Sequence, residues 1–224
     1  MPAPTIVFDL DGTLIDTAPD LVGTLNAIFA REGLTPVAYE DARAMIGGGV
    51  RLMIARGIEA DGRTVAPTDL ERMFADFIAY YADHIADRSQ PFPGLIDALD
   101  TLEASGHRLA VCTNKLERLA RLLLDALGLT GRFATICGQD TFGMMKPDPE
   151  VLRRTILAAG GDPRHAIMIG DSITDIRTAR AAELPVIAVD FGYSEEPIET
   201  CGADRLISHF AQLPAAIAAF DAAK

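Results

Sequence analysis

The sequence predicts an α/β protein whose core is a Rossmann-like, doubly wound parallel sheet, with an all-helical cap inserted into it. Short runs rich in valine and isoleucine recur along the chain and are apolar on both faces, which is typical of buried parallel strands. Amphipathic helical patterns separate these runs, and such an alternation favours helices on both faces of one sheet. One long stretch near the N-terminus breaks the alternation, because its spacing is helical throughout.

The predicted strands are five apolar runs, at residues 5–8, 108–112, 134–137, 166–169 and 186–189. Helical patterns cover the segments between the later runs, and glycines such as Gly128 mark helix ends. Asp148 and Pro149 are suited to the N-cap and the first position of a helix. Pro214 is placed near the start of the last helix.

The stretch without strands runs from residue 16 to about residue 90. One helical pattern in it ends at Gly33, and a longer one covers residues 67–87. The chain returns to the alternating pattern after PFPG at residues 91–94, a stiff turn suited to a domain boundary. We therefore expect an inserted helical cap domain at residues 16–93 and a discontinuous core domain at residues 1–15 and 94–224.

Composition excludes several classes of partner. Of the 224 residues, 49% are hydrophobic and 23% charged, as expected of a globular protein with a sizeable core. The formal net charge of -12 repels nucleic acids and anionic lipids, so we expect neither a nucleic-acid partner nor a membrane surface. The N-terminus lacks a signal-peptide pattern and the three cysteines form no CxxC pair, which favours a cytoplasmic protein with reduced thiols.

Polar side chains follow the predicted strands near the points where the strands end. Ligands of an open α/β sheet bind at the carboxyl ends of its strands, so these side chains are the first candidates for a functional site. They supply four carboxylates, a hydroxyl, an amide and an ammonium group: Asp9, Asp11, Thr113, Asn114, Lys146, Asp171 and Asp175.

Two of the carboxylates, Asp9 and Asp11, are separated by one residue and can face the same crevice once the glycine after them turns the chain away. One of them can attack a substrate while the other transfers protons. Asp9 and Asp171, with Asp175 nearby, form the hard-oxygen donor set that Mg²⁺ prefers. Lys146 would then balance the remaining charge of a phosphoryl group.

Each of these residues also has a purely structural interpretation. Thr113 and Asn114 are suited to capping a helix, and Lys146 to a solvated surface. Asp171 and Asp175 are suited to the first turn of a helix, where acidic side chains complement the helix dipole. Their occurrence together at successive strand ends favours a shared catalytic function.

Four motifs resemble, in content and order, those of the haloacid dehalogenase superfamily of phosphohydrolases: DLDGTLIDT, VCTNK, KPDP and GDSITDI. The resemblance covers essentially the whole chain and extends to the subgroup with a helical cap after the first motif. Residues 189–193 and the three glycines at residues 47–49 are also similar to phosphoglycolate phosphatases. This resemblance implies hydrolysis of a small phosphomonoester, with 2-phosphoglycolate as the leading substrate.

The resemblance also implies the role of each motif residue. Asp9 would attack phosphorus and become an aspartyl-phosphate, while Asp11 would protonate the leaving oxygen and later activate water. Mg²⁺ would be held by Asp9, the backbone carbonyl of Asp11 and Asp171. Thr113 and Asn114, with backbone amides of the first motif, would bind the phosphoryl oxygens.

Charge and specificity involve further residues. The resemblance implies that Lys146 stabilises the charge on nucleophile and phosphate, and that Asp175 orients Lys146 or a water held by the metal. Because the net charge slows the approach of an anionic substrate, we expect a locally positive mouth with contributions from Arg51 and Lys115. The cap would close as a lid, with Gly48 and the glycines beside it offering backbone amides to a substrate carboxylate.

Several alternatives keep the same motifs. A β-phosphoglucomutase-type phosphotransferase or a pyrophosphatase of the same superfamily would retain all four, and a regulatory module would accept phosphate on Asp9 without turnover. Carbon–halogen cleavage is disfavoured, because a leaving halide needs no proton and Asp11 would have no function. The sequence is compatible with a monomer or a homodimer. Four aromatic residues of the cap are expected in its core: Phe74, Phe77, Tyr80 and Tyr81.

Overall fold

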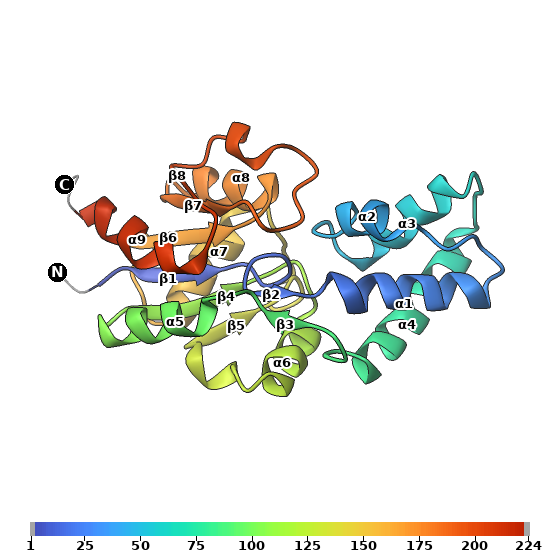
Figure 1. Cartoon of the computed structure of the whole chain (residues 1–224), viewed down its shortest axis with the longest axis horizontal. Helices are drawn as coiled ribbons and strands as arrows, with labels where there is room; N and C mark the ends of the chain where they lie inside the picture. The colour runs from blue at the N-terminus through green and yellow to red at the C-terminus, as the bar shows by residue number, and fades with distance from the viewer. Residues whose placement is uncertain (1–2, 222–224) are drawn as a thin grey trace.

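A six-stranded parallel sheet forms the centre of the larger part of the molecule (Figure 1). The computed structural model describes residues 3–221. The strands lie in the spatial order β5 (Thr135–Cys137), β4 (Arg108–Cys112), β1 (Thr5–Phe8), β6 (Ala166–Gly170), β7 (Val186–Val189) and β8 (Arg205–Ile207). Chain order runs outward from β1 in both directions, so the sheet is doubly wound, as predicted. Edge strand β8 lies outside the prediction because two of its three residues are exposed and leave no buried run.

Side chains of the strands alternate between two hydrophobic clusters, one on each face of the sheet. Ile6 and Phe8 belong to the first cluster, and Val7 between them belongs to the second. Three helices cover the first face: α5 (Leu95–Ala104), α6 (Glu117–Ala126) and α9 (Leu213–Asp221). Two helices cover the second: α7 (Pro149–Ala158) and α8 (Ile173–Ala181). Because β1 is buried on both faces, three of its four residues, Ile6 to Phe8, form an uninterrupted apolar run.

Two helices begin with side-chain caps near the strand ends. Asp148 accepts a hydrogen bond from the backbone N–H of Glu150 at 2.9 Å, so α7 begins at Pro149, as predicted. Ser172 and Asp175 form a capping box at the start of α8. Asp175 also packs tightly against Gly170, where an added Cβ would lie 2.4 Å from the Cβ of Asp175. The last residue of β6 must therefore be small for Asp175 to approach the strand end.

A helical segment lies to one side of the sheet (Figure 1). It contains α1 (Ala18–Arg31), α2 (Tyr39–Ala44), α3 (Val50–Ala60) and α4 (Pro67–Asp83). Helix α4 packs against both α1 and α3. Phe77 and Tyr81 are fully buried, and Phe74 and Tyr80 are partly buried against the same core. The aromatic side chains of α4 therefore belong to the interior or to its border.

A short two-stranded sheet joins the ends of the helical segment. Strand β2 (Ile15–Asp16) pairs antiparallel with β3 (Gln90–Pro91), so the outgoing and returning chains lie side by side. The Asp20 carboxylate strengthens this junction by accepting hydrogen bonds from the backbone N–H groups of Arg88 at 3.0 Å and Ser89 at 2.7 Å. The sequence analysis expected no strand here, because two residues are too few to show an alternating pattern.

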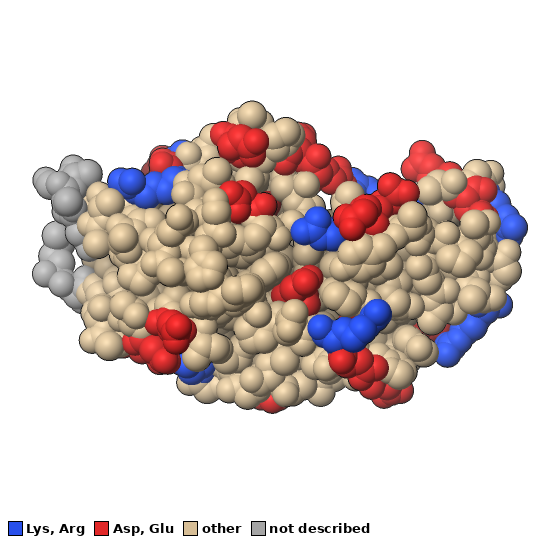
Figure 2. Space-filling model, viewed as in Figure 1, with Lys and Arg blue, Asp and Glu red and all other residues tan. Residues whose placement is uncertain are grey.

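The other regular elements of the described residues are three 3₁₀ helices: η1 (Thr130–Arg132), η2 (Ile198–Thr200) and η3 (Phe210–Gln212). Within residues 3–221, no helix has both the length and the apolar character that crossing a membrane requires. Acidic and basic side chains on the face shown in Figure 2 lie in small groups among uncharged residues. Exposed ion pairs such as Arg72–Glu32 contribute little to the stability of a fold, so the apolar clusters dominate its stability.

Candidate active site

The candidate site lies at the carboxyl end of β1, where the strand order reverses. Strand β1 stands between β4 and β6, which follow it in the chain on opposite sides, and crevices open at such switch points. Asp9 comes directly after β1, and its backbone N–H donates to the carbonyl of Ile169 in β6 at 2.9 Å. Thr113 is held in the same way at the end of β4 by the carbonyl of Cys137 at 3.0 Å. The parallel ladder therefore fixes where both motifs lie.

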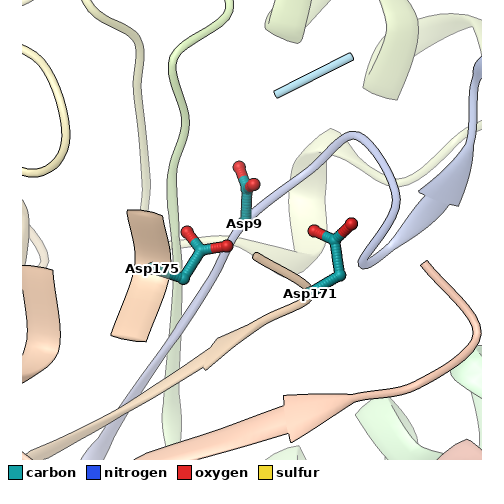
Figure 3. A group of neighbouring side chains, drawn as sticks. All are labelled: Asp9, Asp171 and Asp175. Carbon is teal, nitrogen blue, oxygen red and sulfur yellow. The ribbon is translucent and has the colours of Figure 1, made fainter. Parts of the chain in front are cut away.

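Three buried carboxylates converge at this edge of the sheet. Oxygens of Asp9, Asp171 and Asp175 lie within 4.8 Å of one another. Figure 3 shows that Asp9 and Asp171 come from chain segments that follow strands, and that the three side chains point to the same side. Asp171 is held by two hydrogen bonds, from the hydroxyl of Thr13 at 2.9 Å and the backbone N–H of Tyr193 at 2.7 Å.

A buried lysine connects two of these carboxylates. The Nζ atom of Lys146 lies 2.6 Å from an oxygen of Asp175 and 2.9 Å from an oxygen of Asp9. Asn114 positions the lysine through its backbone: the Asn114 side chain accepts from the Lys146 N–H at 2.9 Å and donates to the Lys146 carbonyl at 3.2 Å. Both ends of the Asn114 amide are thus engaged with Lys146.

The charges of this cluster are not balanced by the protein. Burial raises the pKa of Asp9 to about 6, although the positive charge of Lys146 acts in the opposite direction. Burial, with the negative charges of Asp175 and Asp9, raises the pKa of Asp171 to about 8. Three carboxylates share one ammonium group, and a buried excess of negative charge is costly. An oxygen-rich donor set of this kind fits a small divalent cation such as Mg²⁺.

Asp11 faces the helical segment and has different partners. Its carboxylate accepts hydrogen bonds from the hydroxyl of Thr17 at 2.8 Å and from Nζ of Lys115 at 2.8 Å. The Lys115 side chain is only 5% exposed and also donates to the hydroxyl of Tyr81 in α4 at 3.0 Å. Although burial acts against it, the charge of Asp11 holds the pKa of Lys115 above its ordinary value. Lys115 therefore lies at the site as a cation.

A pocket joins the strand ends to the helical segment. It is partly open to solvent. Its polar wall includes Asp9, Asp11, Thr113, Asn114 and Lys115. Apolar side chains form most of the remaining wall, several of them from the helical segment: Leu21, Ile46, Val50, Met53, Phe74, Ile78, Leu116 and Leu119. Gly47, Gly49, Tyr81 and Gln139 complete it.

The structure brings most of the candidate residues together, whereas Arg51 and Gly48 belong neither to the carboxylate cluster nor to the pocket wall. Arg51 does not line the pocket: its guanidinium donates two 2.9 Å hydrogen bonds to Glu71 and lies over the ring of Phe74. Glu71 offsets the positive charge of Arg51, which weakens the expected contribution of Arg51 to a positive mouth. Gly48 is also outside the pocket wall, whereas its neighbours Gly47 and Gly49 line it.

Some residues of the site were not identified as functional from the sequence. Thr13 and Tyr193 hold Asp171, Thr17 holds Asp11, and Tyr81 contacts Lys115. The signal for Thr13 and Tyr193 was their place inside segments that resemble the family. Tyr81 had no such signal, because its spacing in α4 is that of any core residue and its partner is 34 positions away.

Known proteins are similar to this chain in sequence and in fold. Residues 6–189 match the haloacid dehalogenase-like hydrolase family. The chain is 48% identical over 218 residues to a phosphoglycolate phosphatase of Mesorhizobium japonicum, covering 97% of this chain and 96% of the relative. It is 47% identical over 215 residues to a phosphoglycolate phosphatase of Caulobacter vibrioides, covering 95% and 90% of the two chains.

A solved structure supports the same relationship. The fold matches the crystal structure of a predicted phosphoglycolate phosphatase from Haemophilus somnus with a TM-score of 0.90 and 26% identity, covering 96% of this chain and 97% of the other. The agreement extends over core and helical segment together. The chain therefore belongs to the haloacid dehalogenase-like hydrolases and is a phosphatase.

Proposed function

We propose that this phosphatase hydrolyses a small phosphomonoester by transferring its phosphoryl group to Asp9, with 2-phosphoglycolate as the substrate. The observation that carries the chemistry is the buried Asp9 carboxylate with Nζ of Lys146 2.9 Å away. An anionic nucleophile meets an anionic ester only where positive charge offsets their repulsion. The phosphoglycolate phosphatases with 48% and 47% identity support the choice of substrate.

The reaction has two steps. An oxygen of Asp9 attacks phosphorus, the bond from phosphorus to the ester oxygen breaks, and Asp11, in its protonated form, gives its proton to that oxygen. Asp11 then takes a proton from a water molecule that attacks the aspartyl-phosphate, which releases phosphate and restores Asp9. Asp9 and Asp11 are two residues apart, and both line the pocket in which the ester would lie.

Other groups hold the phosphoryl oxygens and the charge. The Thr113 hydroxyl lines the pocket beside Asp9 and would donate to a phosphoryl oxygen. Lys146 would neutralise charge on Asp9 and the phosphoryl group, with Asp175 fixing its Nζ at 2.6 Å. We assign Asn114 to positioning rather than to direct phosphate binding, because its amide already holds the Lys146 backbone.

Mg²⁺ is the proposed cofactor. Asp9, Asp171 and the backbone carbonyl of Asp11 would hold it, and the excess of buried carboxylate supports this assignment. When bound, the ion would neutralise phosphoryl charge and align the ester with the attacking oxygen. Thr13 and Tyr193 would keep Asp171 oriented toward it.

We also propose that residues 16–93 act as a lid on a core formed by residues 1–15 and 94–224. The pairing of β2 with β3 supports a boundary at this point, because the chain enters and leaves the helical segment through these two adjacent strands. Apolar side chains of the helical segment line the pocket beside Asp9, so closure would exclude water from the reaction. Gly47 and Gly49 would contribute backbone to the closed site.

The deciding experiment compares phosphate release, with Mg²⁺, from 2-phosphoglycolate, glucose 1-phosphate, pyrophosphate and para-nitrophenyl phosphate. The Asp9→Asn variant is the blank. We expect the highest kcat/KM for 2-phosphoglycolate. Preference for pyrophosphate, or isomerisation of a sugar phosphate without net phosphate release, would replace this function with one of the alternatives. No release above the blank on any ester would contradict catalysis altogether.

A further inference from the structure

We infer that Lys115 and Tyr81 form the subsite for a second anionic group of the substrate, a carboxylate two bonds from the ester oxygen. The inference rests on the proposed function and deepens it, because it names the residues that distinguish such a substrate from other phosphomonoesters. Lys115 follows β4, and Tyr81 belongs to α4 of the helical segment. Substrate recognition would thus take place where the two parts of the chain meet.

Lys115 lies where the chemistry of the ester requires a cation for the carboxylate. In 2-phosphoglycolate, one methylene group separates the carboxylate carbon from the ester oxygen. A cation for this carboxylate must therefore stand beside the group that protonates the ester oxygen. Asp11 is that group in the proposed reaction, and Lys115 lies 2.8 Å from it.

Lys115 can release one of its three donors to a substrate. An ammonium group carries three N–H donors. In the structure Lys115 contacts both oxygens of Asp11, at 2.8 and 3.1 Å, and the hydroxyl of Tyr81. One of the two contacts with Asp11 can pass to a substrate, because the Thr17 hydroxyl also holds Asp11 at 2.8 Å.

Tyr81 offers a second donor beside the first. Among the residues that the structure describes, its hydroxyl takes part in one hydrogen bond, as the acceptor from Lys115. Burial raises the pKa of Tyr81 to about 12, so the hydroxyl keeps its hydrogen at neutral pH. Tyr81 and Lys115 both line the pocket. An ammonium and a hydroxyl side by side suit the two oxygens of a carboxylate.

The other cations near the site are committed elsewhere. Lys146 lies between Asp9 and Asp175, on the side where the phosphoryl group would be transferred. Arg51 is paired with Glu71 outside the pocket. Of the described residues that line the pocket, Lys115 is the one lysine or arginine. The apolar walls around it lower the local dielectric and strengthen any contact that it makes with an anion.

The experiment compares two esters that differ at one group: 2-phosphoglycolate and ethyl phosphate, which has a methyl group in place of the carboxylate. We would measure kcat and KM separately, with Mg²⁺, for the wild type and for Lys115→Met and Tyr81→Phe. Lys115→Met should raise the KM for 2-phosphoglycolate roughly 10- to 100-fold, as expected for loss of a hydrogen bond to a charged group. Tyr81→Phe should raise it roughly 2- to 10-fold. The KM for ethyl phosphate should change little in both.

Matched variants separate this role from a loss of charge or of fold. Arg118→Met removes one positive charge from an exposed position three residues further along and should leave both KM values unchanged. Lys115→Arg keeps the charge and should retain most of the preference for 2-phosphoglycolate. If Lys115→Met fails to fold, the KM effect of Tyr81→Phe decides the matter, because that variant removes a single oxygen.

The results distinguish failure of the proposed carboxylate subsite from failure of the proposed substrate. If the wild type prefers 2-phosphoglycolate and both variants keep that preference, the subsite is wrong and the proposed substrate stands. An equal rise of KM for both esters would also overturn the subsite, because it would mean that Lys115 acts only through Asp11. If the wild type hydrolyses para-nitrophenyl phosphate but does not prefer 2-phosphoglycolate to ethyl phosphate, the proposed substrate is wrong and the subsite falls with it.

Discussion

Two buried lysines lie at the site, Lys115 just after β4 and Lys146 in the loop between β5 and α7, and their surroundings differ. Lys146 contacts Asp9 and Asp175, which come from the end of β1 and the start of α8. Lys115 contacts Asp11 on the sheet side but also Tyr81, which belongs to the helical segment. The proposed chemistry is therefore assembled on one sheet edge, whereas the proposed specificity depends on how α4 lies over that edge.

The two lysines also differ in the charged groups around them. Burial alone would lower the pKa of each lysine, yet carboxylates beside them hold both pKa values above the ordinary range. Three carboxylates lie near Lys146, and their excess of negative charge favours the binding of a cation. The Lys115 side has one carboxylate and, with a hydroxyl beside it, suits an anion. Loss of a residue near Lys146 should thus slow the hydrolysis of all substrates. Loss of a residue near Lys115 should weaken the binding of selected substrates only.

The largest expected effect is that of Asp9→Asn. An amide cannot form the aspartyl-phosphate, so phosphate release should fall on the order of 10⁴- to 10⁶-fold on every ester. Release is measured with the purified variant after its fold has been checked by circular dichroism. Appreciable turnover would contradict covalent catalysis by Asp9.

Asp11→Asn should have an effect that depends on the leaving group. With 2-phosphoglycolate the loss in kcat should be roughly 10²- to 10⁴-fold, because an alkoxide needs a proton as it leaves. With para-nitrophenyl phosphate the first step should suffer less, since the nitrophenolate leaves without a proton. Rapid-quench measurement of the phosphorylation step on both esters tests this. Equal losses would count against Asp11 as the general acid.

Lys146→Met sharpens the contrast between the two lysines. Removal of one preorganised electrostatic contact should lower kcat roughly 10²- to 10³-fold on 2-phosphoglycolate and ethyl phosphate alike. Lys115→Met, by contrast, should separate these two esters. Steady-state kinetics of both variants on both esters provide the test, and a substrate-dependent loss in Lys146→Met would remove the distinction.

Stability should depend on pH and on Mg²⁺ through the carboxylate cluster. The pKa of Asp9 rises from 3.8 to about 6 and that of Asp171 from 3.8 to about 8, so the metal-free protein should lose stability as pH rises from about 4 to about 8. Protons compete with the ion, so Mg²⁺ should raise Tm more at pH 8.5 than at pH 5.5. Thermal unfolding at both values measures this. Asp171→Asn should reduce the difference, and an identical Mg²⁺ effect at both pH values would argue against the site.

The smallest effect is expected at Arg51. Arg51→Met breaks an exposed ion pair with Glu71, which contributes little to stability, and removes no residue of the pocket wall. Its kcat/KM for 2-phosphoglycolate should therefore stay close to that of the wild type. A clear rise in KM would return Arg51 to the substrate-binding residues.

Local patterns predicted much of the fold. Strands such as residues 5–8 are apolar on both faces because helices cover both, and a buried strand between helices is visible in sequence. The cap at Asp148 is equally local, because its partner lies two residues away. Strands β2, β3 and β8 were not predicted, because they are short or exposed and their sequences show no run of buried apolar residues.

The sequence by itself determined the α/β class, the strand ends that bear the polar residues, and the set that includes Asp9, Asp171 and Lys146, because each belongs to a short motif whose spacing is local. Only the tertiary structure decided which side chains contact one another. It turned Asn114 toward the backbone of Lys146, paired Arg51 with Glu71, and brought Tyr81 within 3.0 Å of Lys115. Such contacts join residues that are 20 or more positions apart in the chain. Their geometry depends on how helices pack against a sheet edge, and no periodicity of the sequence encodes that packing.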